Sequence, residues 1–211
     1  MLEIKNLHVD IQNINILSDL NLKVKKFSSI IGRNGAGKTT LMRSIIGVLK
    51  IRKGSIIFED KNLTNINSHL MSKLGIGYMP EDRRLVPELN VRENILTPVW
   101  LLKNKTSEKQ ELDRVLEFIP EIKNFLDRSS FQLSGGQQKL VSLARAMIVG
   151  KKLLLLDEPF EGVAPALADR LVELIKSLSK LDLIALITES DETYSKKINS
   201  EIIRIERGKI L

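Results

Sequence analysis

The chain has 211 residues, of which 43% are hydrophobic and 28% charged, a balance typical of a globular protein with a buried core. The net charge of +7 suggests anionic partners, but the lysines are scattered, which favours a solvated surface over a nucleic-acid groove. The absence of cysteine excludes disulfides and thiolate chemistry, and no apolar run approaches the roughly 18 residues of a membrane span.

The first elements predicted along the chain are strands. Residues 2–5 and 20–24 alternate apolar and polar side chains, the pattern of a strand with one buried face. The apolar run 27–31 predicts another strand, and the glycine-rich segment 32–40 follows it directly. That segment fits the pattern G-x-x-x-x-G-K-[ST] and leads into an amphipathic helix, so it predicts a loop that binds a nucleoside triphosphate.

The residue types of this loop suit phosphate binding. Glycine lets the backbone take positive φ angles and bring its N–H groups against phosphate oxygens, and the following helix N-terminus adds partial positive charge. Lys38 can bridge the β- and γ-phosphates, and the Thr39 hydroxyl can bind Mg²⁺. The loop residues expected at the nucleotide are Gly32, Asn34, Gly35, Ala36, Gly37, Lys38, Thr39 and Thr40.

The middle of the chain changes from strands to helices. A strand is expected at 54–58, a short helix at 68–74, and a buried strand at 75–79 that Pro80 ends. Helical spacing then dominates as far as residue 131, which predicts a helical insertion. The helical segments expected there are 91–102, 107–119 and 121–126.

The last third alternates helices and strands. A helix with an apolar face follows residues 133–137, and the strand 153–156 ends in two acids. The elements expected afterwards are a helix at 164–178, a strand at 183–187, a short helix and a closing hairpin. Strands that alternate with helices predict an α/β protein with a mostly parallel sheet covered on both faces.

The two acids, Asp157 and Glu158, are candidates for catalysis. In a sheet with a phosphate loop at its strand ends, an acid at the end of another strand lies beside the metal. Asp157 is therefore expected to hold Mg²⁺ together with Thr39. Glu158 is placed to polarise the attacking water, a role that contributes roughly 10²–10⁴-fold to the rate. The alternative is a core strand capped by two acidic turn residues.

The phosphate loop, the segment Leu133-Ser134-Gly135-Gly136-Gln137 before a helix, and the strand ending in Asp157-Glu158 together resemble the ATP-binding cassette (ABC) family. The resemblance covers essentially the whole chain. It implies a P-loop NTPase core with a mostly parallel sheet, an antiparallel N-terminal β subdomain and an inserted helical subdomain. The expected divisions of the single domain, 1–211, are a RecA-like core with the β subdomain (1–81 and 148–211) and the helical subdomain (82–147).

The resemblance also implies a mechanism. Two such domains pair head to tail and enclose two ATP molecules, each bound by the phosphate loop of one domain and the Ser-Gly-Gly-Gln segment of the other. Glu158 is implied as the catalytic residue, and Glu81 lies in the loop that senses the γ-phosphate. The residues expected to contact ATP outside the phosphate loop are Ser134, Gly135, Gly136, Gln137, Glu81 and Ser190.

A closer similarity links the chain to the ATPase subunits of branched-chain amino-acid and urea-type importers. The stretches that carry it are 32–37, 78–84, 87–94 and 158–165. Most cassette ATPases have glutamine where Glu81 stands, whereas this branch has Pro-Glu. The similarity implies a second ABC ATPase subunit and membrane permease subunits as partners, with no nucleic acid. It also implies a peripheral location on the cytoplasmic face of the inner membrane.

One surface of the helical insertion is a candidate for permease docking. Four apolar side chains at helical spacing are expected to form a groove for a permease helix, which would use i, i+3 and i+4 anchors. They are Val91, Ile95, Leu96 and Trp100. The alternative is that these residues only pack the core of the helical subdomain.

Two departures from the family pattern concern the nucleotide. An adenine-stacking aromatic residue usually follows the first strand, where this chain has Asp10 and Ile11. Loss of stacking, about 1–3 kcal/mol, corresponds to roughly 5- to 150-fold weaker binding. Ser190 occupies the switch histidine position. These departures leave open a weakly or non-hydrolysing partner in a heteromeric transporter. A soluble non-transport ABC ATPase is less favoured, because 211 residues leave no room for coiled coils or a second cassette.

Overall fold

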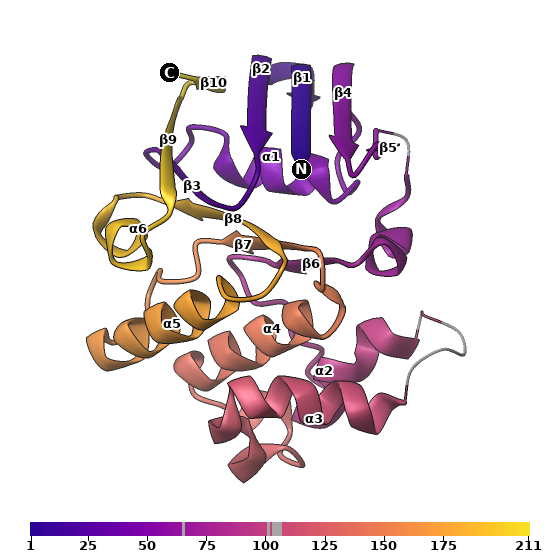
Figure 1. Cartoon of the computed structure of the whole chain (residues 1–211), viewed down its shortest axis with the longest axis vertical. Helices are drawn as coiled ribbons and strands as arrows, with labels where there is room; N and C mark the ends of the chain where they lie inside the picture. The colour runs from indigo at the N-terminus through magenta and orange to yellow at the C-terminus, as the bar shows by residue number, and fades with distance from the viewer. Residues whose placement is uncertain (65, 101, 103–106) are drawn as a thin grey trace.

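The computed structural model describes residues 1–64, 66–100, 102 and 107–211. Two sheets lie one above the other with α1 (Lys38–Ile45) between them, and most of the remaining helices lie below the larger sheet (Figure 1). This arrangement confirms the expected α/β class, with an antiparallel N-terminal part, a mostly parallel sheet and a helical insertion.

The smaller sheet is antiparallel. Its strands, in order across the sheet, are β2 (Ile14–Val24), β1 (Leu2–Ile11), β4 (Lys53–Phe58) and β5 (Lys61–Asn62). β1 and β2 form a hairpin whose turn residues, Gln12 and Asn13, take φ angles of 50° and 65°. Positive φ at both residues suits the twist of a two-residue hairpin turn. The hairpin lengthens both strands beyond the expected segments, so Asp10 and Ile11 belong to β1 and do not follow it.

The larger sheet has six strands. In spatial order they are β10 (Lys209–Ile210), β9 (Glu201–Glu206), β3 (Phe27–Ile31), β8 (Ile184–Glu189), β7 (Leu153–Asp157) and β6 (Ile76–Met79). All neighbours pair in parallel except β10 with β9. Along β7, Leu153 and Leu155 enter the hydrophobic core on one face, while Leu154 and Leu156 enter the core on the other. Burial on both faces explains why this strand is a continuous leucine run.

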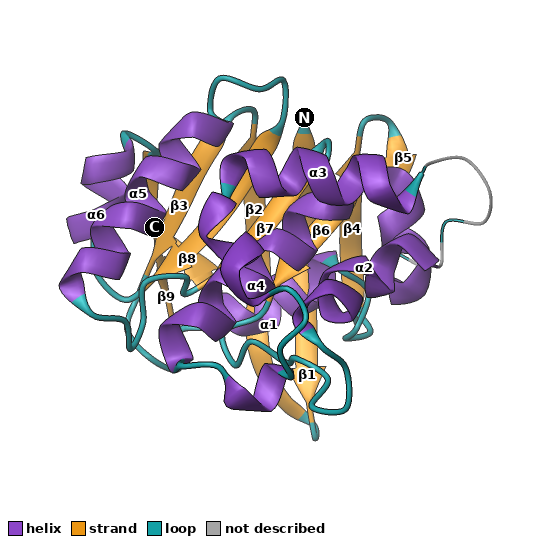
Figure 2. Ribbon diagram, turned by 90° about the horizontal axis from the view of Figure 1, so that it is seen from below, coloured by secondary structure: helices purple, strands orange, loops and turns teal. Residues whose placement is uncertain are grey.

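Helices cover both faces of this sheet. They are α1 (Lys38–Ile45), η1 (Ser68–Leu74), α2 (Val91–Trp100), α3 (Glu108–Phe118), η2 (Pro120–Phe125), η3 (Ser130–Gln132), α4 (Gly135–Val149), α5 (Pro165–Leu178) and α6 (Thr193–Ile198), where η denotes a 3₁₀ helix. α1 packs in the core shared with the antiparallel sheet, whereas α4 and α5 pack in the core on the opposite face. Seen from below, α3, α4 and α5 lie across the strands (Figure 2).

The helical insertion differs from expectation in its boundaries. α2 ends at Trp100 instead of residue 102, and residue 101 lies outside the described residues. The segment 121–126 forms a 3₁₀ helix, which Pro120 begins, and not an α-helix. α4 packs against α2 and α3 and continues to Val149, past the expected boundary at residue 147.

Candidate active site

The glycine-rich segment forms a loop between β3 and α1. Gly35 and Gly37 have φ angles of 82° and 106°, which only glycine adopts without strain. A Cβ atom on Gly32 would lie 2.5 Å from the carbonyl oxygen of Ile205, so the loop passes too close to β9 for a larger residue. Among the described residues no side chain caps the N-terminus of α1, and its first turn contains no acid. Its N–H groups are therefore available to phosphate oxygens.

Lys38, the first residue of α1, faces into the loop. Its Nζ donates to the carbonyl oxygen of Gly32 at 2.6 Å and lies 2.9 Å from Oε1 of Glu158. Both charged side chains are almost completely buried, at 4% and 7% exposure. The Glu158 carboxylate shows that Lys38 is directed at a position where an anionic oxygen fits, so the loop suits a phosphate group.

Asp157 lies at the end of β7 and is completely buried. One of its oxygens accepts hydrogen bonds from the hydroxyls of Thr188, at 2.7 Å, and Thr39, at 3.3 Å. The other accepts from the Tyr78 hydroxyl at 3.0 Å. Burial raises the pKa of Asp157, and these hydroxyl donors oppose the change. Burial and the neighbouring Asp157 also raise the pKa of Tyr78.

The donor set around Asp157 fits a magnesium ion. The carboxylate of Asp157 and the hydroxyl of Thr39 are hard oxygen ligands from two different elements, and their atoms already lie within hydrogen-bond distance. Mg²⁺ prefers such oxygens and commonly keeps several waters and substrate phosphates as its other ligands. Two protein ligands beside a phosphate loop are therefore sufficient.

Glu158 follows β7 in a left-handed backbone conformation, with φ of 47°. Its N–H donates to the carbonyl oxygen of Thr188 at 3.1 Å, and its own carbonyl oxygen accepts from Nζ of Lys139 at 2.6 Å. Its carboxylate faces Lys38 and also the hydroxyl of Ser190, at 3.4 Å and 3.5 Å. The expected general base is thus held at the phosphate loop by both its backbone and its side chain.

Ser190 lies beside the phosphate loop. Ser190 is exposed, and its hydroxyl donates to Oδ1 of Asn34 at 3.0 Å, which joins the switch position to the phosphate loop. Ala36 is buried, and its carbonyl oxygen accepts a hydrogen bond from the N–H of Gly208. Thr40, in the first turn of α1, accepts a hydrogen bond from Ser44 through its carbonyl. A cavity of about 540 Å³ has Gly35 and Ser190 among its lining residues.

Further acids surround Glu158. Burial raises the pKa of Glu189 to about 8. Burial, followed by the charges of Glu158 and Glu81, raises the pKa of Glu161. Glu81 itself is exposed in the loop after β6. The structure therefore brings Glu81 close to Glu161, which is itself close to Glu158.

The segment Ser134–Gln137 begins α4. The Ser134 hydroxyl accepts from the N–H of Gln137 at 3.3 Å, and the Gln137 side chain accepts from the N–H of Ser134 at 3.0 Å, which is a capping box. A Cβ on Gly136 would lie 2.6 Å from Cδ2 of Leu167, and one on Gly135 would lie 3.2 Å from Nη1 of Arg83. Among the described residues no hydrogen bond joins Ser134–Gln137 to the phosphate loop of the same chain.

The expected permease groove is wrong for three of its four residues. Val91, Ile95 and Leu96 are buried in the core beneath α4, and only Trp100 is exposed, at 47%. α2 packs against α4 and α3, and its apolar stripe lies in the core that these helices share. A separate hollow of about 230 Å³, the η1–α2–α4 groove, lies beside it. The lining residues are Ile46, Ser68, His69, Met71, Ser72, Ile76, Tyr78, Thr97, Pro98, Arg145 and Val149.

Several functional candidates were not identified from the sequence. Tyr78 and Thr188 hold Asp157, and Lys139 holds the Glu158 backbone. Glu189 lies buried among them. One signal was available, since Lys139 stands one turn before Leu143 on the apolar face of its helix, and lysine is seldom fully buried without a partner.

Comparison with known proteins decides the family. Residues 17–161 match the family model described as "ABC transporter". The chain belongs to this family. The matched region contains the phosphate loop, the Ser134–Gln137 segment and both acids at the end of β7. Membership identifies the chain as an ATP-binding cassette ATPase of a transport system.

Individual relatives agree with this assignment. The cassette is 32% identical to the high-affinity branched-chain amino acid transport ATP-binding protein BraG of Pseudomonas aeruginosa, over 94% of this chain and 85% of that protein. It is 29% identical to the lipopolysaccharide export system ATP-binding protein LptB of Escherichia coli, over 98% of this chain and 87% of that protein. The ADP conformation of MJ1267, an ATP-binding cassette of an ABC transporter, superposes with a TM-score of 0.83 at 29% identity, over 100% of this chain and 89% of that chain.

Proposed function

We propose that this cassette is the ATP-hydrolysing subunit of an importer for branched-chain amino acids or a related small polar solute. The observation that carries the catalytic part is the buried pair of Lys38 and Glu158 next to Asp157 and Thr39. The similarity to BraG over 94% of the chain supports the class of solute.

The residues divide the work of hydrolysis. Lys38 and the N–H groups of residues 32–40 bind the phosphates, and Glu158 accepts a proton from the attacking water. Water adds to the γ-phosphorus, and the bond to the β–γ bridging oxygen breaks to give ADP and phosphate. Thr39 and Asp157 hold Mg²⁺, which when bound neutralises charge that develops on the phosphates. Ser190, which contacts Asn34 of the loop, and Glu81, which lies close to Glu161, would face the γ-phosphate.

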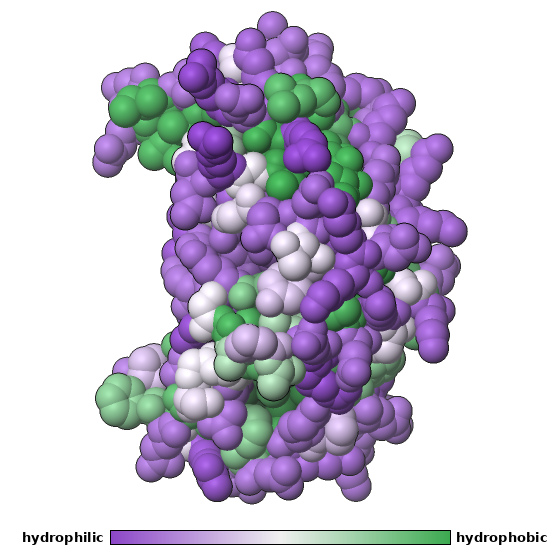
Figure 3. All heavy atoms as spheres, turned by 90° about the vertical axis from the view of Figure 1, so that its left-hand side faces the viewer, coloured by the Kyte–Doolittle hydropathy of each residue, from purple (hydrophilic) through white to green (hydrophobic). Residues whose placement is uncertain are grey.

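The site requires a second ATPase subunit. The N–H groups of Ser134 and Gln137 are used in their own capping box, so the N–H groups of Gly135 and Gly136 at the start of α4 are the ones that would serve ATP bound by a partner. The side that carries α6 and β9 is mainly hydrophilic, with separate apolar patches (Figure 3).

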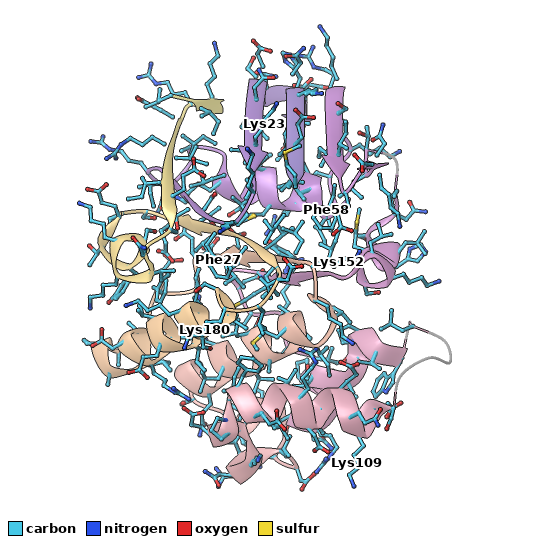
Figure 4. The ribbon with its side chains drawn as sticks, viewed as in Figure 1. Lys23, Phe27, Phe58, Lys109, Lys152 and Lys180 are labelled. Atoms are coloured by element: carbon cyan, nitrogen blue, oxygen red, sulfur yellow. The ribbon has the colours of Figure 1, made fainter. Side chains whose placement is uncertain are left out.

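Membrane permease subunits are the other partners. We place their docking at the η1–α2–α4 groove, which is lined by residues of α2 and α4 and by residues of η1 and β6 outside the helical insertion. No helix in the described part of the chain has the length and apolar character of a membrane span. Docking on permease subunits would place the cassette on the cytoplasmic face of the inner membrane. In Figure 4 the labelled Lys23 and Lys109 lie far apart, whereas Lys152 and Lys180 line one hollow of about 930 Å³ together with Lys25 and Lys26.

Two alternatives have specific support. The 29% identity to LptB favours an ATPase that drives lipopolysaccharide export. The absence of an aromatic residue at Ile11 and of histidine at Ser190 favours a weakly hydrolysing partner in a heteromeric transporter. The geometry of Lys38 and Glu158 argues against the second alternative, since both catalytic side chains are present and in contact.

Replacement of Glu158 by glutamine tests the proposal. The variant should bind ATP as the parent does but lose hydrolysis by roughly 10²–10⁴-fold, because an amide cannot accept the proton. Glu173→Gln, the same change at an exposed residue of α5, is the matched control. Parental turnover in Glu158→Gln, measured in the complex with its partner subunits, would remove the catalytic assignment. Uptake of leucine or extraction of lipopolysaccharide by reconstituted vesicles separates the two transport classes.

A further inference from the structure

Lys139 is an unusual residue for the interior of a protein. It lies in the second turn of α4 with 1% of its surface exposed. Its Nζ donates to the main-chain carbonyl oxygen of Glu158 at 2.6 Å. A buried ammonium group is costly unless polar partners compensate its lost hydration, so this contact must be specific.

The surroundings of Lys139 come from three separate segments. Glu81 follows β6, Glu161 follows β7, and Glu189 ends β8, and the charges of all three favour the protonated amine. Burial, with a smaller effect of Arg83, lowers the pKa of Lys139. The amine therefore lies at the junction of the helical subdomain with the loops that surround the hydrolysis centre.

The contact fixes a strained part of the backbone. Glu158 has a φ of 47°, a conformation that glutamate rarely adopts without outside support. Its N–H is held by Thr188, while its carbonyl oxygen is held by Lys139 and by the N–H of Glu161 at 3.2 Å. Pro159, which follows, has no N–H to contribute. Lys139 thus supplies the one side chain that holds this carbonyl among the described residues.

We propose that Lys139 is a positioning residue, which fixes the carbonyl oxygen of Glu158 so that the Glu158 carboxylate stays aimed at the attacking water. The inference rests on the proposed function, because it assumes Glu158 to be the general base. It adds a coupling between the helix that begins with Ser134–Gln137 and the hydrolysis centre of the same chain. Engagement of Ser134–Gln137 by a partner's nucleotide would then reach Glu158 through α4 and Lys139.

The test replaces Lys139 with methionine, whose side chain is unbranched and of similar length but lacks the amine that donates to the Glu158 carbonyl oxygen. We expect turnover to fall by about 10- to 100-fold while the Kd for ATP stays within about twofold, because a misplaced base affects the chemical step alone. Backbone amides of residues 157–163 should exchange with deuterium about tenfold faster or more, while those of α4 keep the parental rate. Lys176→Met, at an exposed position of α5, is the control.

A second variant and a double variant make the outcome decisive. Lys139→Gln keeps a polar group in the interior, but its side chain is too short to reach the Glu158 carbonyl. If Lys139→Met does not fold, the same loss of turnover and the same faster amide exchange are expected of Lys139→Gln. In the Glu158→Gln background, Lys139→Met should change the residual turnover by about twofold or less, because two residues that act as one unit are not additive.

If the Lys139 variants turn over ATP and exchange the amides of residues 157–163 at the parental rates, the inference is overturned while the proposed function stays intact. A uniform rise in exchange across α4 and β7 would also overturn it, as it would show a purely structural role. Parental turnover in Glu158→Gln would instead overturn the proposed function.

Discussion

The buried carboxyl group of Glu189 predicts an unusual pH dependence of stability. Glu189 is the last residue of β8, is 7% exposed, and accepts a hydrogen bond from the N–H of Phe160 at 3.3 Å. Burial raises its pKa from 4.5 to about 8, with a further contribution from Glu158, while the Phe160 N–H and Lys139 act in the opposite direction. The perturbation is Glu189→Gln, which imitates the protonated acid and keeps the acceptor oxygen.

The sign and size follow from proton linkage. The folded state holds the proton more tightly than the unfolded state, so this contribution to stability is complete below pH 4.5 and is lost as pH rises towards 8. At 1.36 kcal/mol for each unit between the two pKa values, the loss is about 5 kcal/mol and is an upper value. Glutamine cannot ionise, so the stability of the variant should not show this loss as pH rises.

The assay is unfolding by urea of the parent and the variant at pH 6, 7, 8 and 9, without nucleotide. The free energy of unfolding of the parent should fall relative to that of Glu189→Gln as pH rises, and the variant should be the more stable of the two at pH 9. Glu206→Gln, an exposed residue of β9, controls for the loss of a negative charge. Parallel pH profiles of the parent and Glu189→Gln would refute the reasoning.

Two further predictions concern ATP and the permease. Lys38→Ala should weaken ATP binding by at least about tenfold, because the phosphates lose a buried charged donor; calorimetry with the purified chain measures the Kd, and an unchanged value would remove the assignment of the loop. A charge in the η1–α2–α4 groove, as in Thr97→Glu, should abolish uptake by reconstituted vesicles but leave the ATPase activity of the purified chain intact. Trp100→Glu, one turn further along α2 and exposed, tests the surviving member of the originally expected groove. If both variants fold and transport at the parental rate, the permease docks elsewhere.

The sequence alone determined the features that depend on local order along the chain. The glycine spacing of residues 32–40 requires positive φ at fixed positions, and the structure has it at Gly35 and Gly37. The continuous leucines of β7 are all buried only if both faces of the strand are covered. The run therefore predicts a strand in the interior of a parallel sheet. Alternation of strands and helices then gave the α/β class. The resemblance to ABC ATPases rested on these motifs and their order.

Only the tertiary structure decided which side chains meet. Tyr78 lies 79 residues before Asp157 in the chain, and Thr188 lies 31 residues after it, so no spacing in the sequence connects them. The burial of Val91, Ile95 and Leu96 was equally out of reach, because an apolar stripe reads the same whether it packs inside the chain or against a partner. Lys139 is the clearest case: a helix pattern shows a lysine on an apolar face, but only the packing of α4 against the loop after β7 shows that its amine ends on the carbonyl oxygen of Glu158.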